Sequence, residues 1–293
     1  MRHMQCFPTG KCVFLRVLTA GLALIFSLLC PYTSLAQGAD IARDLANPFS
    51  SLWNIVNQLN WNQLKGGYFN ETHTQFNWNL QPVMPVPLNQ YFNVVNRPVI
   101  PYYQNPYLDL NGVVEYASGM GDIQLASLLS PNKAEGIIYG LGVTMIAPTA
   151  KDSIHIGQGL WQFGPAAGLF YVSKKFVVGV FPQHWTSVSG MDNLHPGTRF
   201  TNMQYAISYL PSPKLTIFSS SNILIDWTKD EANRWTIPIG IGVSYLLNFG
   251  KTPVSIGINC QAIVKRPEDI LHQDSIIRFT FTPVIPSPFD RKE

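Results

Sequence analysis

The histidines outside the N-terminal region are the side chains best suited to acid–base or metal chemistry. The nearest histidine–serine pairing is His184 with Ser187, and a separation of three residues on one strand places two side chains on opposite faces. The sequence contains neither the H-E-x-x-H zinc motif nor the G-x-S-x-G turn that carries a nucleophilic serine. No histidines stand at the spacing of metal ligands, so we predict no catalytic residue, no metal and no cofactor. The histidines are His73, His155, His184, His195 and His272.

A second group of side chains can bind a molecule but cannot catalyse. Asparagine and glutamine recur at alternate positions of several apolar segments, where an amide donates and accepts hydrogen bonds without carrying charge. Such amides can line a path for a solute, or they can form a packed polar core that only holds the fold together. We predict that the following amides face the inside of the fold: Asn77, Asn79, Gln81, Gln124, Gln162, Gln204, Asn222 and Gln261.

The segment 235–247 indicates which kind of element positions these side chains. Large apolar residues occupy every second place from Trp235 to Leu247, and the places between them hold mostly small or weakly polar residues. A period of two indicates a β-strand with two different faces. At about 3.3 Å per residue the strand is about 40 Å long, which suits a tilted crossing of a bilayer. A long strand of a soluble β-sandwich is the alternative, although soluble strands usually have about 5–6 residues.

The same alternation recurs along the chain and predicts about twelve strands. Short links alternate with longer ones without exception, and 64–72 and 102–120 are expected to be two of the long loops. This asymmetry and an even strand number are typical of bacterial outer-membrane barrels, so we predict an all-β, transmembrane antiparallel up-and-down β-barrel. The strands are predicted at 53–62, 75–81, 92–100, 122–130, 139–145, 161–171, 176–187, 202–209, 215–227, 235–247, 254–261 and 277–282.

The N-terminal region has the layout of a secretory signal peptide. A positively charged start is followed by an apolar run over 17–29, which is shorter than the roughly 20 residues of a spanning helix, and then by a small-x-small cleavage pattern ending at Ala36. We predict four segments from this layout. They are a signal peptide over 1–36, a periplasmic lead-in of one or two helical turns over 37–51, the barrel over 52–283, and a C-terminal tail over 284–293.

Charge and cysteine content narrow the classes of function. The formal net charge of +3 belongs to the predicted signal peptide, because the remaining chain carries 17 basic and 17 acidic residues. Charge therefore gives no reason to expect nucleic acid as a partner. Three of the four cysteines also lie in the signal peptide, so Cys260 remains alone and no disulfide framework is expected.

Several short motifs are spread over nearly the whole chain after the signal peptide. They include Asn47-Pro48-Phe49, Gly119-Met120-Gly121-Asp122, Ala147-Pro148-Thr149-Ala150, Gly157-Gln158-Gly159-Leu160-Trp161 and Trp235-Thr236-Ile237-Pro238-Ile239-Gly240. In type and order these motifs resemble one family of bacterial outer-membrane transporter proteins, which carries the names neuromedin U and phenol meta-pathway degradation protein. The resemblance implies a barrel and the passage of small organic molecules, and it implies no defined substrate. Family members often end on an aromatic residue that serves as an assembly signal; here the tail follows the last strand, so Phe279 and Phe281 are expected to serve instead.

The predicted function is an outer-membrane channel or uptake protein for small, mostly uncharged organic molecules, aromatic ones included. The alternatives are a barrel enzyme that acts on lipid and a structural barrel with a blocked lumen. The expected partners are outer-membrane lipid, the solute and the barrel assembly machinery. Inward glycines such as Gly140 and Gly168 are expected to leave space in the lumen. Ile239 and Ile241 are expected to face lipid, and a serine at the inward Gly242 is expected to be tolerated.

Four charged residues on the predicted inward faces suggest a constriction. Arg97, Asp122, Asp226 and Arg278 all fall in the outer half of their strands if the long loops lie outside. Two cations and two anions at one level would partly neutralise each other, as charges in a low-dielectric wall require. We predict that both arginines oppose both aspartates near the outer mouth, with Arg97 and Asp122 in contact. Four separate charges, each facing water, are the alternative.

Overall fold

The computed structural model describes residues 35–289, except residues 68 and 269. The predicted signal peptide lies outside the described residues apart from its last two positions, and so does the end of the predicted tail at 290–293. Among the described residues, no helix is both long enough and apolar enough to cross a membrane.

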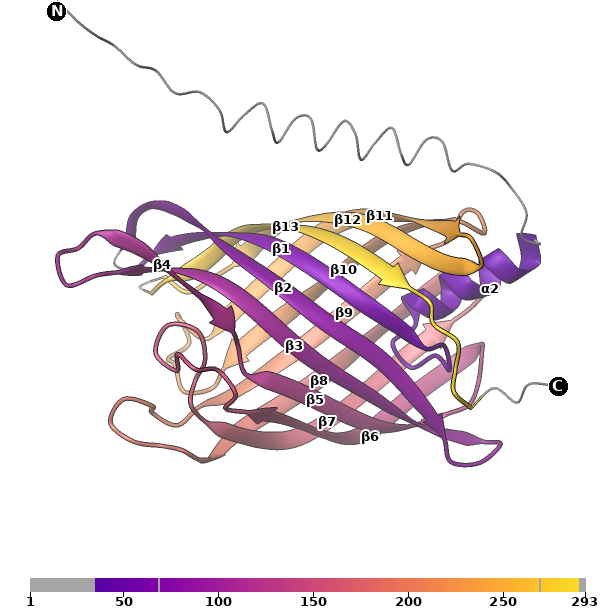
Figure 1. The fold of residues 1–293 in the computed structure, drawn as a ribbon, viewed down its shortest axis with the longest axis horizontal. Coiled ribbons are helices and arrows are strands. Elements are labelled where there is room, and N and C mark those ends of the chain that lie inside the picture. The colour runs from indigo at the N-terminus through magenta and orange to yellow at the C-terminus, as the bar shows by residue number, and fades with distance from the viewer. Residues whose placement is uncertain (1–34, 68, 269, 290–293) are drawn as a thin grey trace, which may run out of the picture. The chain divides into compact units, whose positions relative to one another are not determined.

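The strands form one antiparallel sheet that closes on itself, because β1 pairs with β2 on one side and with β13 on the other (Figure 1). β4 and β5 both pair with β3 and together fill one place in the wall, so the barrel has twelve strand positions. The strands are β1 (Asn54–Gly66), β2 (Phe69–Pro87), β3 (Phe92–Leu108), β4 (Val114–Met120), β5 (Ile123–Pro131), β6 (Gly136–Ala147), β7 (Trp161–Val172), β8 (Phe176–Ser189), β9 (Arg199–Tyr209), β10 (Leu215–Asp226), β11 (Trp235–Phe249), β12 (Thr252–Lys265) and β13 (His272–Pro283).

The predicted twelve-stranded up-and-down barrel is confirmed. Two predicted long loops are wrong. Residues 102–120 form a hairpin in which β3 continues to Leu108 and pairs with β4, and most of 64–72 belongs to β1 and β2, because β1 continues to Gly66 and β2 begins at Phe69. Pro101 and Pro106 hid the extension from the sequence pattern, since proline lacks the N–H that a strand interior normally donates. The wall at β3 is therefore seven residues longer on its outer side than a strand that ends at Pro101.

The outer face of the wall is apolar, as the alternation predicted. On β11 the side chains of Ile239 and Ile241 are 56% and 69% exposed, while Gly240 and Gly242 between them face inward. Large apolar side chains also face outward on other strands. Those on β6 and β7 are Tyr139, Leu141, Val143, Trp161, Phe163, Leu169 and Tyr171. A continuous apolar outer surface of this kind is stable only against lipid or another apolar phase.

The two ends of the barrel differ. Turns such as 132–135 between β5 and β6 lie at one end, and the long loops and the β3–β4 hairpin extend from the other (Figure 1). The described helix, α2 (Leu35–Ala46), lies at the end with the short turns, and the C-terminal segment leaves from the same end (Figure 1). The start of the predicted tail still follows the wall, because Val284 and Ile285 donate backbone hydrogen bonds to Pro253 and Trp53.

The interior of the barrel is not polar throughout. Toward the short turns, the inner faces of β5 to β9 carry buried apolar side chains that pack into one cluster. The sequence pattern missed this cluster, because we took every inward set to be polar or small. Unbroken apolar runs were the available signal: Leu169-Phe170-Tyr171-Val172 and Phe176-Val177-Val178 supply apolar side chains to both faces of a strand.

Candidate functional site

The N-terminal segment lies across the short-turn end of the lumen. Helix α2 has 12 residues, about three turns, which is longer than the one or two turns predicted. Pro48 stands just after the end of α2. The residue before a proline favours extended backbone, so the helix does not continue through Asn47. Ala42, Leu45 and Ala46 then face the lumen and line its lower cavity. The predicted lead-in is therefore part of the lumen wall.

Phe49 anchors this segment inside the barrel. Its side chain is 2% exposed, and its ring meets the rings of Phe170 and Phe181 edge-on, with centroids 5.5 and 5.4 Å away. The ring rests on two glycines that face each other across β6 and β7: a β-carbon at Gly140 would lie 2.9 Å from Phe49 Cε1, and one at Gly168 would lie 2.2 Å from Phe49 Cζ. The space that these glycines were expected to leave for solute is thus filled by Phe49.

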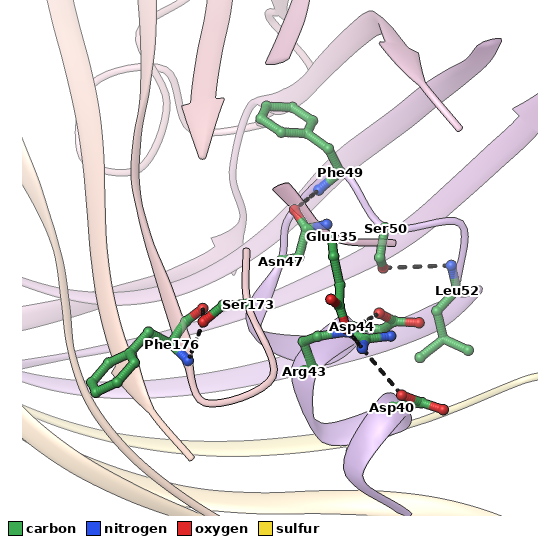
Figure 2. A network of polar contacts seen from close by, with 10 residues as sticks. All are labelled: Asp40, Arg43, Asp44, Asn47, Phe49, Ser50, Leu52, Glu135, Ser173 and Phe176. Atoms are coloured by element: carbon green, nitrogen blue, oxygen red, sulfur yellow. Dashed lines mark hydrogen bonds and ion pairs between the residues drawn. The ribbon is translucent and has the colours of Figure 1, made fainter. Parts of the chain in front are cut away.

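Polar contacts hold the segment to the nearest turn. Arg43 donates from Nη1 to Glu135 in the β5–β6 turn at 2.8 Å, and it also pairs with Asp40 at 3.1 Å and Asp44 at 3.4 Å (Figure 2). The side chain of Asn47 accepts the backbone N–H of Phe49 at 3.1 Å and fixes the turn that aims Phe49 inward (Figure 2). Burial raises the pKa of Asp44, and its contact with Arg43 opposes that shift. The docked segment is therefore held by both apolar and charged contacts.

Above this segment the lumen contains two adjoining cavities of about 190 and 230 Å³. Five residues line both of them: Gln58, Gln81, Arg97, Gln204 and Arg278. Residues of α2 line one side of the lower cavity, and the upper cavity is lined mainly by amides. The structure places seven of the eight amides predicted to face inward on these walls: Asn77, Asn79, Gln81, Gln124, Gln204, Asn222 and Gln261.

The eighth amide, Gln162, is buried beneath the outer loops. It donates to Gln158 at 2.6 Å and accepts from the Thr198 hydroxyl at 3.0 Å. Its role is to join the loop before β7 to the loop before β9. Gln162 therefore belongs to the lid of the lumen and does not line either cavity.

The amides on β1 and β2 form a hydrogen-bonded ladder across the wall. Asn60 donates to Asn77 at 2.9 Å, Asn77 and Asn79 bond each other at 2.9 and 3.0 Å, and Gln81 donates to Gln58 at 3.3 Å. Bonds between neighbouring side chains limit how many rotamers each amide can adopt. This side of the lumen thus presents a fixed pattern of donors and acceptors to whatever enters.

The predicted ring of four opposed charges is wrong. Asp122 lies in the break between β4 and β5 and accepts the backbone N–H groups of Ala150 at 3.0 Å and Gln158 at 2.7 Å. Asp226 ends β10 and accepts the hydroxyl and N–H of Thr228 at 2.6 and 2.9 Å. Both aspartates thus close outer loops, and neither lines the cavities.

Arg97 and Arg278 lie deeper in the lumen than predicted. Because β3 continues to Leu108, Arg97 falls in the lower part of its strand, and Arg278 falls in the middle of β13. The structure brings these two arginines to the same pair of cavities and leaves both aspartates at the outer loops. The lining of the lumen is therefore cationic at this level, where the sequence had suggested a balance of charges.

The sequence predicted that the side chains of His184 and Ser187 do not pair, and each of them makes contacts with other residues. His184 Nδ1 lies 2.8 Å from the Thr201 hydroxyl. Ser187 Oγ accepts the N–H of Thr198 at 2.8 Å and donates to its carbonyl at 3.2 Å. Each side chain is thus engaged with β9 or the loop before it.

A different serine and histidine meet in the outer loops, with an aspartate behind them. Ser153 Oγ lies 3.0 Å from His195 Nε2, and His195 Nδ1 lies 2.9 Å from Asp192 Oδ1. This is the order of groups in a hydrolytic triad. Sequence reasoning missed it because Ser153 and His195 belong to different loops, although both loops contain the pattern D-x-(I/L)-H-x-G at 152–157 and 192–197.

The repeated pattern explains the aspartate–histidine contact without catalysis. Asp152 binds the N–H and ring of His155 as Asp192 binds those of His195, with distances of 2.7 to 2.9 Å. In each loop the histidine backbone N–H lowers the pKa of the aspartate, because it stabilises the charged form. The contact is therefore a loop-closing motif that occurs twice, and the second copy adds a bond to Ser153.

The described residues contain no cluster of three or more histidine, cysteine, aspartate or glutamate side chains that could hold a metal ion. No protein-family model matches the sequence, and no curated protein matches it.

Solved structures do resemble the chain. An outer membrane channel from Pseudomonas putida F1 aligns with a TM-score of 0.58 and 15% identity over 80% of this chain and 96% of that one. The NanC porin aligns with a TM-score of 0.46 and 8% identity over 80% of this chain and 99% of that one. Outer membrane phospholipase A from Escherichia coli aligns with a TM-score of 0.42 and 13% identity over 86% of this chain and 99% of that one. The latter two likenesses are too distant to carry an argument. The first shows that this chain has the fold of an outer-membrane β-barrel.

Proposed function

We propose that this protein is a channel of the bacterial outer membrane for small organic molecules, closed at its periplasmic end by its own N-terminal segment. The observation that carries the proposal is the pair of adjoining cavities in the lumen, the lower of which is lined by residues of α2 and by Asn47 and Pro48 after it. A barrel that served only as a support would not need cavities lined by polar side chains in its interior. The amide-rich walls suit solutes that exchange hydrogen bonds with the wall, including aromatic molecules with polar substituents.

The closure is the part of the barrel best suited to move. Its apolar contacts come from Phe49 and from the α2 side chains Ile41, Ala42, Leu45 and Ala46, and its charged contacts join it to a single turn. Undocking needs no break in the β-sheet, since α2 is not paired with any strand. A channel that opens by release of residues 37–49 follows directly from this arrangement.

Liposome swelling tests the proposal. The mature protein and a variant without residues 37–49 are reconstituted at equal density, and swelling is followed with a series of small neutral solutes such as arabinose and benzyl alcohol. The variant should admit solutes much faster than the full mature chain. If neither protein admits any solute, the barrel is a structural one with a blocked lumen, as the sequence allowed.

Hydrolysis at the outer loops is a second candidate function, because Ser153, His195 and Asp192 are aligned for it. In that reaction Ser153 Oγ would attack an ester carbonyl while His195 takes its proton. Asp192 is 58% exposed in its side chain, whereas the aspartate of a triad is normally buried. Labelling by a fluorophosphonate probe that disappears in Ser153→Ala would establish hydrolysis, and we expect no labelling in either protein.

The resemblance of the sequence motifs to the transporter family named neuromedin U or phenol meta-pathway degradation protein agrees with a channel. On this proposal the partners of the protein are outer-membrane lipid, its solute and the barrel assembly machinery. The assembly signal would rest on Phe279 and Phe281, whose rings face outward at the seam where β13 meets β1.

A further inference from the structure

Two arginines from different parts of the wall face one region of the lumen. Arg97 is on β3 and Arg278 is on β13, with β2 and β1 between these strands in the wall. Both side chains line the lower and the upper cavity, so both lie where the two cavities adjoin. A solute passing between the cavities must pass these two guanidinium groups.

Neither arginine has an ionic partner within the part of the chain that the structure describes. Nη1 of Arg97 is buried and makes no hydrogen bond, and Arg278 uses only Nε, which donates to Asn60 Oδ1 at 2.8 Å. Lys214 adds a third cation to the lower cavity. No described aspartate or glutamate lines either cavity.

A buried guanidinium N–H group without an acceptor, such as that on Nη1 of Arg97, is unfavourable, because the lost hydration is not replaced. Most buried charges are paired for this reason, and here the wall supplies amides but no carboxylate. An anion that enters the lumen would supply the missing acceptors. A guanidinium group presents parallel N–H donors that match the two oxygens of a carboxylate.

We propose that Arg97 and Arg278 form a binding site for a small organic carboxylate. This inference rests on the proposed channel function and changes its expected solute from an uncharged molecule to an anion. The carboxylate would lie between the two guanidinium groups, and the ring of Phe181, 5.2 Å from the Arg97 guanidinium carbon, fixes one of them in place.

The surroundings of the site define the rest of the ligand. Phe218, Val56 and Leu246 line the lower cavity beneath the arginines, and they offer apolar contact to the body of the ligand. Each cavity is smaller than the roughly 300 Å³ at which sites for drug-sized ligands begin. The ligand class is therefore a carboxylate with a short apolar body, for which benzoate is a suitable probe.

Calorimetric titration of the mature protein in detergent tests the site directly. Benzoate should bind at least tenfold more tightly than benzamide, which has the same ring and no charge. Arg97→Gln and Arg278→Gln should each weaken benzoate binding at least tenfold and leave benzamide binding unchanged. Arg234→Gln is the matched control, because Arg234 stacks on Trp227 in an outer loop and should not affect either ligand.

Three results would overturn the site. They are equal binding of benzoate and benzamide, unchanged benzoate binding in both glutamine variants, and equal competition by acetate, which lacks the apolar body. Electrophoresis shows whether each variant is folded, because a folded barrel in detergent migrates differently before and after boiling. If a glutamine variant does not fold, the corresponding lysine variant decides, because it keeps the charge and loses the parallel donors: benzoate binding should weaken, and unchanged binding contradicts the proposal.

Swelling assays separate failure of the site from failure of the channel. In the Phe49→Ala background, benzoate entry should exceed benzamide entry, and Arg278→Gln should remove the difference. If benzoate binds but no solute enters liposomes, the site stands and the channel function is wrong. If neutral and anionic solutes enter equally with and without the arginines, the channel stands and the site is wrong.

Discussion

Replacing Phe49 by alanine should open the periplasmic end of the lumen. Phe49 is the most deeply buried side chain of the N-terminal segment, and both of its aromatic neighbours belong to the barrel wall. Loss of a buried phenylalanine ring typically costs about 3–5 kcal/mol, and the contacts of Arg43 with Glu135 remain in the variant. We take about 3 kcal/mol as the loss in docking free energy, because the cavity left behind can partly refill with water.

The expected change in conductance follows from this loss. For a segment docked by about 4 kcal/mol, removal of about 3 kcal/mol raises the undocked fraction from about 0.1% to about 15%. The time-averaged conductance of single channels in a planar bilayer should rise by a similar ratio, as openings become more frequent at an unchanged amplitude. A variant without residues 37–49 should be open permanently and should give the upper limit of conductance.

Phe289→Ala provides the matched control, because Phe289 is an exposed phenylalanine beside Trp53 in the C-terminal segment and lies outside the lumen. It should leave conductance and swelling unchanged. If Phe49→Ala conducts as the unaltered protein does while the deletion is open, Phe49 is not the anchor. If the deletion is also closed, the N-terminal segment does not close the lumen.

Three further results follow from the same structure. Gly168→Ala places a β-carbon 2.2 Å from Phe49 Cζ, so it should raise channel conductance, and it should have no further effect in a Phe49→Ala background. Ile241→Arg on the outer face should lower the free energy of unfolding in lipid by about 2–4 kcal/mol, whereas Ser255→Arg on the cavity wall should cost much less in the same denaturant titration. The lowered pKa of Asp152 means that its loop contributes stability above the ordinary carboxyl value of 3.8 and loses it as pH falls through the lower folded value. Amide hydrogen exchange of that loop should therefore accelerate at low pH, and Asp152→Asn should remove the dependence.

The predicted tolerance of serine at Gly242 needs revision on structural grounds. A β-carbon there would lie 2.6 Å from the ring of Phe218 and 2.7 Å from the carbonyl oxygen of Ile258. The sequence assigned Gly242 to the correct face, but it could not reveal that a ring and a neighbouring strand occupy the space above it. An inward position in a barrel is thus not automatically a tolerant one, and Ser255 is the better control.

The sequence was sufficient for the barrel and insufficient for its contents. The strand at 235–247 could be predicted because alternation is a local property: lipid is a uniform solvent, so every outward residue meets the same apolar surroundings. The same reasoning placed seven amides on the cavity walls. The sequence placed Arg97 too near the outer end of the barrel. The height of Arg97 in the wall depends on where β3 ends, and the pattern suggested an end at Pro101 where the strand continues to Leu108.

The tertiary structure alone decided what fills and closes the lumen. Phe49 stands before the first strand, and its socket comes from Gly140 and Gly168, about ninety to one hundred and twenty residues further along the chain. Arg97 and Arg278 likewise line the same cavities only because closure of the barrel brings β13 beside β1. Alternation fixes which face of a strand a side chain occupies, since that depends on its immediate neighbours. The residues that a side chain contacts across the lumen depend on strand register and barrel closure. Both are set by the pairing of strands that are distant in the sequence.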